Sequence, residues 1–264
     1  MKKRIFITGA SSGIGRATAE LLVKQGHEVW GTSRDPARLA SLGKLHPLRM
    51  DLSDLDSVRA AFAQAWTESG GLDVVINNAG SGHFDAAETL PHEKIEALFG
   101  SLVFTQIELC RLALLAMQER PSGLVINVTS LASRMPVPFM AAYNAAKAAM
   151  ASYTFSLQLE LPDRGSRVVD LQPGDICTSF NDGIAPPPSA DTRIAKAWCA
   201  VDRNFRKAPP PELVARRVLE IVESNNPPPR STVGDLFQSR IAPLIFRFLP
   251  QRVRVWGLKM YYGI

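Results

Sequence analysis

Short apolar segments alternate with longer amphipathic ones as far as about residue 171, and this alternation restricts the fold more than any other feature. Runs such as DVVIN at 73–77 and LVINV at 124–128 are almost continuously apolar, which is typical of strands buried on both faces. Strands that alternate with helices form a parallel sheet covered by helices on both faces, so we expect a doubly wound α/β fold. The expected strands are 4–8, 27–32, 46–50, 73–77, 124–128 and 167–171, and the expected helices are 14–25, 36–42, 55–69, 92–118, 143–159 and 211–224, with a short helical piece at about 194–201.

The composition excludes several kinds of protein. The chain has 264 residues, of which 46% are hydrophobic and 21% charged, as in an ordinary globular protein. Its three cysteines lie far apart without a CxxC motif, which argues against a disulfide framework and a zinc site and favours a reducing compartment. The apolar run at 5–7 is too short for a signal peptide, and no stretch approaches the ~20 apolar residues of a membrane span. We expect a cytoplasmic protein with no metal site.

A glycine-rich turn, TGASSGIG at 8–15, joins the first expected strand to the first expected helix. Its glycines allow the backbone to turn tightly and to approach a pyrophosphate, which the positive end of the following helix attracts. A turn of this composition can also occur without a ligand. Its place between a strand and a helix favours a turn that binds a dinucleotide.

Five motifs follow one another along the chain: the glycine turn, NNAG at 77–80, Ser130, YxxxK at 143–147 and Pro-Gly at 173–174. In this order and at these spacings they resemble the short-chain dehydrogenase/reductase family, most strongly over 4–180. The resemblance implies a single-domain Rossmann-like fold that binds NAD or NADP, here residues 1–226 with a substrate lid at about 176–210. It also implies a small-molecule substrate and a homo-oligomer, a dimer or a tetramer, that assembles through the two long helices.

The YxxxK motif suits proton transfer to a carbonyl. A tyrosine is a weak acid, with a reference pKa of ~10, and a nearby positive charge makes it stronger. A lysine four residues later lies on the same helix face. An isolated pair of this kind would more often be two unrelated surface residues, but Ser130 favours a shared role. The resemblance implies that Tyr143 is the acid/base, that Lys147 lowers its pKa and holds the nicotinamide ribose, and that Ser130 orients the carbonyl.

The resemblance also places a set of residues at the cofactor, with Asp51 near the adenine and Thr178 near the nicotinamide amide. Besides Tyr143 and Lys147, the set comprises Gly9, Ser11, Ser12, Gly13, Ile14, Gly15, Arg34, Asp51, Leu52, Asn78, Ala79, Gly80, Pro173, Gly174, Ile176 and Thr178.

The end of the second expected strand favours NADP(H) over NAD(H). In doubly wound folds a carboxylate at this point binds the ribose hydroxyls of NAD, whereas a basic residue accommodates the extra phosphate of NADP. The sequence here is GTSR at 31–34, with no carboxylate, and the planar guanidinium of Arg34 suits a phosphate. The alternative is that Arg34 pairs with Asp35.

One position departs from the family pattern. Many members carry an asparagine in the helix before the serine-bearing strand, where it helps to hold a water of the proton relay. Aligned on Phe99 and Met117, this position is Leu102, whose side chain cannot form hydrogen bonds. Ser101, Thr105 and Gln106 are nearby polar candidates, but none is at the matching position. Two readings follow: an active enzyme with another relay, which we favour, or an NADP(H)-binding sensor with weak or no catalysis.

The segment 227–264 forms a basic, apolar C-terminal extension. It has six basic residues and one acid, Asp235, so it accounts for the whole net charge of +5. Its apolar residues recur at helical spacing around 241–249. They could cover the domain's own core, form an oligomer interface, or lie on an anionic membrane surface. The charge lies in an apolar tail rather than on a reading element, so we expect no nucleic-acid partner.

The apolar residues of the lid and the extension suit a hydrophobic, lipid-like substrate, such as a keto-lipid, a retinoid or a steroid. Phe180, Ile184, Trp198 and Phe205 lie in the lid. The sequence thus predicts an NADP(H)-dependent oxidoreductase that interconverts a carbonyl and a secondary alcohol on such a substrate.

Overall fold

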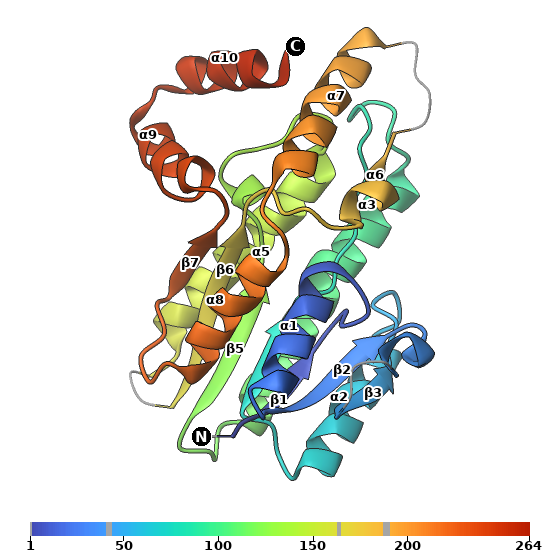
Figure 1. The fold of residues 1–264 in the computed structure, drawn as a ribbon, viewed down its shortest axis with the longest axis vertical. Coiled ribbons are helices and arrows are strands. Elements are labelled where there is room, and N and C mark those ends of the chain that lie inside the picture. Colours follow the sequence, from blue (N-terminus) through green and yellow to red (C-terminus); the bar gives the residue numbers. More distant parts are fainter. Residues whose placement is uncertain (1, 41–43, 163–164, 187–190) are drawn as a thin grey trace.

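A computed structural model describes residues 2–40, 44–162, 165–186 and 191–264, and within them one parallel sheet carries helices on both faces (Figure 1). The strand order is β3-β2-β1-β4-β5-β6-β7, and every neighbouring pair is parallel. The doubly wound fold expected from the sequence is confirmed. The strands are β1 (Arg4–Ile7), β2 (Glu28–Ser33), β3 (Leu45–Arg49), β4 (Val74–Asn77), β5 (Gly123–Val128), β6 (Ser166–Pro173) and β7 (Arg230–Val233).

Two hydrophobic cores lie on opposite faces of the sheet. One packs α1 and α8 against the strands, and the other packs α2, α4 and the end of α5. The helices are α1 (Gly13–Lys24), α2 (Leu55–Ser69), α3 (His92–Phe99), α4 (Thr105–Ala116), α5 (Ala141–Glu160), α6 (Phe180–Ile184), α7 (Thr192–Lys207), α8 (Glu212–Glu223), α9 (Ala242–Phe248) and α10 (Gln251–Tyr262). Short 3₁₀ turns span Pro36–Leu39 (η1) and Leu131–Ser133 (η3), and π-helical turns span Gly100–Phe104 (η2) and Phe237–Ile241 (η4).

The chain order reverses between β1 and β4, which creates a switch point at the carboxyl edge of the sheet. Ligands of doubly wound folds bind in the crevice at this point. The sequence motifs follow the ends of the strands there: Gly9 comes after β1, Asn78 after β4, Ser130 after β5 and Gly174 after β6. The fold therefore gathers segments that are distant in sequence along one edge.

Two expected helices differ from the prediction. The helix expected at 36–42 is only the 3₁₀ turn η1, where the Asp35 side chain accepts a hydrogen bond from the Ala37 N–H; the end of that prediction, 41–42, lies outside the described residues. The helix expected at 92–118 contains the π-helical turn η2, which begins at Gly100. Glycine has a low helix propensity, and π turns often occur near functional sites.

The prediction made one later helix, α7, too short and missed one strand, β7. A short helical piece was expected at 194–201, but α7 extends over 16 residues and the Asp191 side chain caps its start. The strand β7 was not expected, and it extends the sheet by pairing with β6 within the segment 227–264. Only Ser231 and Val233 of this short edge strand are buried, so its apolar signal is weak.

The continuous helix His92–Ala116, formed by α3, η2 and α4, has a mean hydropathy of 1.6 over its most apolar 18-residue window. By length and composition alone it could cross a membrane, although the sequence analysis had identified no such stretch. Here Leu109, Cys110 and Ala113 of α4 pack against the sheet and α2. The helix His92–Ala116 is therefore a core helix of the α/β fold.

Candidate active site

The glycine turn packs directly against the segment that follows β4. Gly9 and Gly13 have left-handed φ angles of 69° and 52°, which favour glycine. A Cβ on Gly9 would lie 2.8 Å from the Cβ of Ala79, and a Cβ on Gly15 would lie 2.2 Å from the Gly9 carbonyl oxygen. The turn therefore leaves no space for side chains at these positions.

Thr8, which the sequence analysis did not select, joins two predicted cofactor segments. Its Oγ1 accepts hydrogen bonds from the N–H groups of Asn78 and Ala79, each at 2.9 Å. The Asn78 side chain in turn donates to the Thr8 carbonyl oxygen at 3.0 Å. Thr8 directly precedes Gly9 in the motif, and this position could have identified it.

The start of α1 suits the pyrophosphate of a dinucleotide. Its N-cap residue, Ser12, forms no side-chain capping hydrogen bond with the helix. The first N–H groups of a helix have no partner within it, and together with the helix dipole they attract an anion. Thr178 reaches this turn from the lid, because a Cβ on Gly13 would lie 3.4 Å from the Thr178 Cβ. The residues present thus fit the phosphates of a nicotinamide dinucleotide.

The predicted adenine end combines Arg34 and Asp51 at the carboxyl ends of β2 and β3. Arg34 is exposed and forms no ion pair with Asp35 among the described residues. The backbone N–H and the hydroxyl of Ser53 donate to Asp51 at 2.9 Å and 2.8 Å, and they hold the pKa of this carboxyl below its usual value, with a smaller contribution from Arg34. The carbonyl of Leu52 accepts a hydrogen bond from Thr105.

The loop after β6 forms the nicotinamide end of the predicted site. Pro173 ends β6, Ile176 is buried, and the Gly174 N–H donates to the Val233 carbonyl of β7 at 2.7 Å. A Cβ on Gly174 would lie 2.9 Å from the Gln238 side-chain oxygen. The segment after β7 therefore packs tightly against the Pro-Gly turn.

Ser130, Tyr143 and Lys147 come together at the ends of β5 and α5. The Ser130 side chain lies near enough to the Tyr143 hydroxyl to affect its pKa, and the Lys147 Nζ lies 5.9 Å from the centre of the Tyr143 ring. Lys147 also donates to the Val128 carbonyl oxygen at 2.9 Å. The structure thus brings together all three residues that the sequence predicts for catalysis.

Burial shifts the pKa of this tyrosine and of this lysine against their charged forms. It raises the pKa of Tyr143 to about 12, against the opposing effect of Ser130. It lowers the pKa of Lys147 to about 8, against the opposing charge of Asp170. A buried environment that penalises charge so strongly also strengthens the electrostatic interactions of any charge that develops there during a reaction.

Leu102 lies where the sequence alignment placed it, beside Lys147. It is fully buried in the π turn η2, and a Cβ on Gly80 would lie 3.0 Å from the Leu102 Cδ2 and 3.8 Å from the Lys147 Nζ. The buried side chain of Gln106 donates to the Ala79 carbonyl at 3.0 Å, and its own oxygen has no partner among the described residues. Gln106 therefore supports the NNAG segment rather than Lys147.

An apolar cluster surrounds the Tyr143 ring. The nearest ring is that of Phe180 in α6, with centroids 5.8 Å apart, and Phe84 contacts Trp198 of α7 with centroids 5.1 Å apart. The same cluster also contains Phe205, Ile184, Met140, Ile194 and Tyr262. The four lid residues singled out in the sequence therefore pack in the same cluster as Tyr143.

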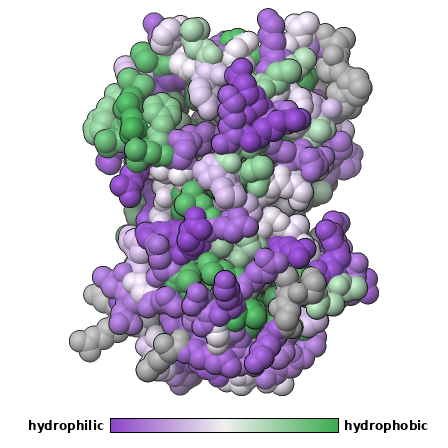
Figure 2. All heavy atoms as spheres, viewed as in Figure 1, coloured by the Kyte–Doolittle hydropathy of each residue, from purple (hydrophilic) through white to green (hydrophobic). Residues whose placement is uncertain are grey.

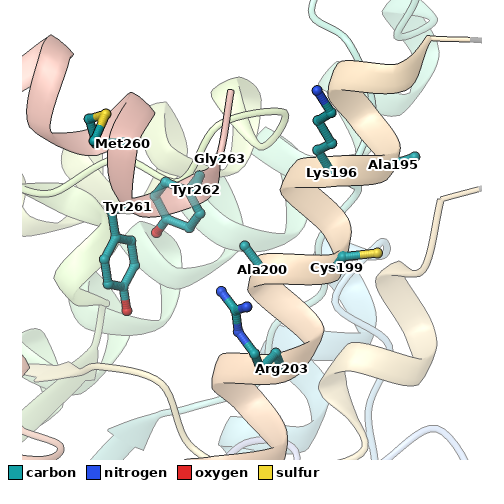
Figure 3. A pocket seen from close by; sticks show the side chains of 9 residues that line it. All are labelled: Ala195, Lys196, Cys199, Ala200, Arg203, Met260, Tyr261, Tyr262 and Gly263. Atoms are coloured by element: carbon teal, nitrogen blue, oxygen red, sulfur yellow. The ribbon is translucent and has the colours of Figure 1, made fainter.

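Two surface hollows lie at the side of this cluster. A hollow of about 400 Å³ lies between α7 and α10, lined among others by Lys196, Cys199, Tyr261 and Tyr262, and Arg203 points from α7 toward the two tyrosines (Figure 3). A second, of about 310 Å³, lies between residues 136–144 and the far side of α10. Neither is lined by Ser130, Tyr143 or Lys147. Within the described residues, no group of three histidine, cysteine or acidic residues could hold a metal ion.

Comparison with known proteins identifies the family of the chain. The family model described as short chain dehydrogenase matches residues 3–188. The 3-ketodihydrosphingosine reductase of Bacteroides thetaiotaomicron is 34% identical over 98% of this chain and 98% of its own. The NADPH-dependent 1-acyldihydroxyacetone phosphate reductase of Schizosaccharomyces pombe is 34% identical over 68% of this chain and 62% of its own.

The fold of a solved structure agrees with this match. A short-chain dehydrogenase from Streptomyces avermitilis superimposes with a TM-score of 0.80, covering 99% of this chain and 96% of its own at 25% identity. The family binds a nicotinamide cofactor, and its members commonly form oligomers and act on small substrates. The fold, the motifs and both sequence comparisons agree, and the chain belongs to the short-chain dehydrogenase/reductase family of oxidoreductases.

Proposed function

We propose that this protein is an NADP(H)-dependent oxidoreductase that interconverts the carbonyl and secondary alcohol of a hydrophobic, lipid-like substrate. The observation that carries the proposal is the position of Tyr143, close to Ser130 and Lys147, within an apolar cluster to which the lid contributes. A substrate carbonyl beside the tyrosine hydroxyl would lie among aromatic and aliphatic side chains.

In this mechanism, the nicotinamide supplies the hydride when bound, and the side chains of the chain control the proton. The Tyr143 hydroxyl donates its proton to the oxygen that becomes the alcohol, and the Ser130 hydroxyl orients that oxygen. Tyr143 becomes a tyrosinate when it donates this proton. Lys147, one helical turn from Tyr143, stabilises the tyrosinate when the lysine carries its positive charge. Leu102 makes the space near Lys147 apolar, so the proton that restores the Tyr143 hydroxyl would arrive by a path that does not use this position.

Two observations favour a keto-lipid among the lipid-like substrates. The cluster around Tyr143 is long and apolar, extending from Phe180 through Phe84 and Trp198 to Tyr262 of α10. The Bacteroides relative is named for a ketone of a sphingoid base, and the Schizosaccharomyces relative for an acylated dihydroxyacetone phosphate. Both names describe a ketone on a lipid.

The proposal predicts NADPH oxidation with long-chain ketones. The purified protein would be mixed with NADPH and a panel comprising a 3-ketosphinganine, a 1-acyldihydroxyacetone phosphate, a retinal and a 3-ketosteroid, and absorbance at the nicotinamide band would be followed. We expect turnover with at least one keto-lipid and little with short ketones of the same reactivity.

The second candidate, a cofactor-binding sensor, is motivated by Leu102 beside Lys147. Tight NADPH binding with no turnover on any member of the panel would favour that candidate instead.

Replacing Arg34 with alanine is expected to raise the KM for NADPH roughly 10- to 150-fold, the effect of losing one charged hydrogen bond to phosphate. The KM for NADH should change less than about threefold, because NADH lacks that phosphate. Arg34 is exposed just past β2, and no carboxylate lies at the strand end. Arg38, another exposed arginine four residues later, provides the matched control as Arg38→Ala. Equal effects on the two cofactors would contradict the NADP(H) preference.

We also propose a cytoplasmic homo-oligomer. Exposed apolar side chains gather on α4, its preceding π turn and α5: Phe104, Leu115, Phe155 and Leu159. Such a patch on paired helices suits an interface with a second copy. The three cysteines are free, which suits a reducing compartment.

A further inference from the structure

The segment after β7 exposes a row of large apolar side chains. On the helix formed by η4 and α9, Phe237, Ile241, Leu244, Ile245 and Phe248 recur at intervals of three or four residues and are 42–76% exposed. Figure 2 shows a hydrophobic patch over α9 on this side of the molecule. The row faces outward, so it does not form part of the domain's own core.

The helix α10 continues this surface. Val253, Trp256 and Met260 lie one or two turns apart and are 40–68% exposed. Arg254 joins the two helices, because its guanidinium donates to the carbonyl oxygens of Leu249 and Arg247. The two rows are therefore held together, and we refer to the eight residues as the C-terminal surface.

Basic side chains surround the C-terminal surface without acidic partners. Arg240, Arg247, Arg252 and Lys259 form no ion pair among the described residues, and the one acid of the segment, Asp235, accepts instead from the Gln238 N–H. Arg247 lies over the Phe248 ring at 5.9 Å. Apolar residues flanked by unpaired cations are typical of a helix that lies in the interface of an anionic bilayer.

We propose that the C-terminal surface docks the protein on an anionic lipid bilayer, with its apolar rows among the acyl chains and its arginines at the phosphate groups. The charge distribution favours this partner over a second copy of the chain. A two-fold contact would place the same cationic surface against itself, which like-charge repulsion disfavours. An anionic bilayer matches both the apolar rows and the charge.

The C-terminal surface lies next to the lid and to the apolar cluster around Tyr143. Leu258 and Tyr262, on the inner side of α10, pack in the same cluster as Tyr143, and Tyr261 accepts a hydrogen bond from Asn204 of α7. Docking would therefore bring the lid side of the cluster close to the bilayer. This consequence, access of a bilayer-dissolved substrate to the cluster, rests on the proposed function, whereas docking itself does not.

Vesicle flotation tests the docking without substrate or cofactor. The full chain would be mixed with vesicles of phosphatidylcholine alone, or of 70% phosphatidylcholine and 30% phosphatidylglycerol. We expect binding to the anionic vesicles and at least roughly tenfold weaker binding to the neutral ones, because each basic residue at such a surface contributes about a fivefold change. Equal binding to both vesicles, or no binding to either, would overturn the proposal.

Variants locate the contact. The double variant Leu244→Ser with Phe248→Ser should weaken vesicle binding at least roughly tenfold, since it removes two inserted side chains. The variant Leu55→Ser, on the 40%-exposed first residue of α2, is the apolar control and should bind as the unaltered protein does. Arg247→Gln should weaken binding about fivefold. Arg216 is an exposed arginine on α8, away from the C-terminal surface, and Arg216→Gln should leave binding unchanged.

The same variants separate the bilayer from a second copy and from the proposed function. If sedimentation showed a dimer that the Leu244→Ser and Phe248→Ser double variant dissociates, while vesicle binding were absent, the surface would be an oligomer interface and the proposal would be wrong. Circular dichroism would show whether the exposed substitutions leave the fold intact. Vesicle binding by a chain that reduces no ketone would uphold docking and reject the proposed function alone.

Discussion

Replacing Tyr143 with phenylalanine is expected to lower kcat for ketone reduction by roughly two to four orders of magnitude, which is the usual contribution of a positioned acid. The substitution removes the hydroxyl that lies near Ser130, whereas the ring keeps its contact with Phe180. NADPH affinity should fall less than about tenfold, because one hydrogen bond at most is lost. NADPH oxidation at saturating substrate and fluorescence titration of NADPH would measure the two effects.

The matched control for this substitution is Tyr153→Phe, on the same helix α5. Tyr153 packs near α4 and the buried part of α5, away from Ser130 and Phe180. It should leave the reduction rate within about twofold, since a partly exposed hydroxyl contributes little. A Tyr143→Phe enzyme that kept the rate of the unaltered protein would show that another group supplies the proton.

The fold could be predicted from the sequence because buried parallel strands have an unambiguous pattern. Runs such as Val74–Asn77 and Gly123–Val128 are apolar at almost every position, as strands covered on both faces must be. The edge strand β7 was missed because only Ser231 and Val233 are buried, and serine carries no apolar signal. Its place in the sheet comes from pairing with β6, which no local pattern shows.

The helix α7 was underestimated for a related physical reason. Its buried residues, Ile194, Ala197, Ala200 and Val201, form a narrow stripe, and the surrounding positions are polar or charged. Such a helix is stabilised by packing on the cluster beneath it rather than by its own propensity. Its cap at Asp191 follows a proline-rich stretch that obscures the start in the sequence.

The site could be located from motif order because parallel strands bring their carboxyl ends to one edge. Ser130, Tyr143 and Lys147 meet as their spacing predicts. Contacts between segments could not be predicted in this way. The bonds from Thr8 to the NNAG segment and the approach of Thr178 to Gly13 depend on the fold as a whole.

The position of Leu102 shows what the sequence could and could not determine. Counting from Phe99 and Met117 matched it to the position where many family members carry an asparagine, and in the structure a Cβ on Gly80 would lie 3.0 Å from its Cδ2 and 3.8 Å from the Lys147 Nζ. The sequence offered Ser101, Thr105 and Gln106 as polar substitutes. Their side chains donate hydrogen bonds to the carbonyl oxygens of Ala97, Leu52 and Ala79 respectively. Leu102 therefore leaves this position apolar, and none of the three polar neighbours takes the place of the asparagine.

Replacing Gly15 with alanine is expected to lower the free energy of unfolding by roughly 3 kcal/mol and NADPH affinity by at least roughly 100-fold. The new Cβ would lie 2.2 Å from the Gly9 carbonyl oxygen and 2.4 Å from the Asn78 side-chain nitrogen. Backbone cannot yield as a flexible side chain can, so the turn must open, and overpacking of this kind costs about 1–3 kcal/mol or more. Opening the turn moves the first N–H groups of α1 away from the phosphates, which is why binding should fall more than stability alone requires. Urea unfolding and NADPH titration measure the two effects.

The control is Gly257→Ala in the interior of α10, where no atom lies within 4 Å of the added Cβ. Alanine should raise the free energy of unfolding there by roughly 0.5–1 kcal/mol, because it favours the helix over the unfolded chain, and NADPH binding should not change. If Gly15→Ala kept both stability and NADPH affinity, the close approach of Gly9, Gly15 and Asn78 would not exist in solution. If it lost affinity and kept stability, the turn would open at little cost and the N–H groups of α1 alone would account for the binding of the phosphates.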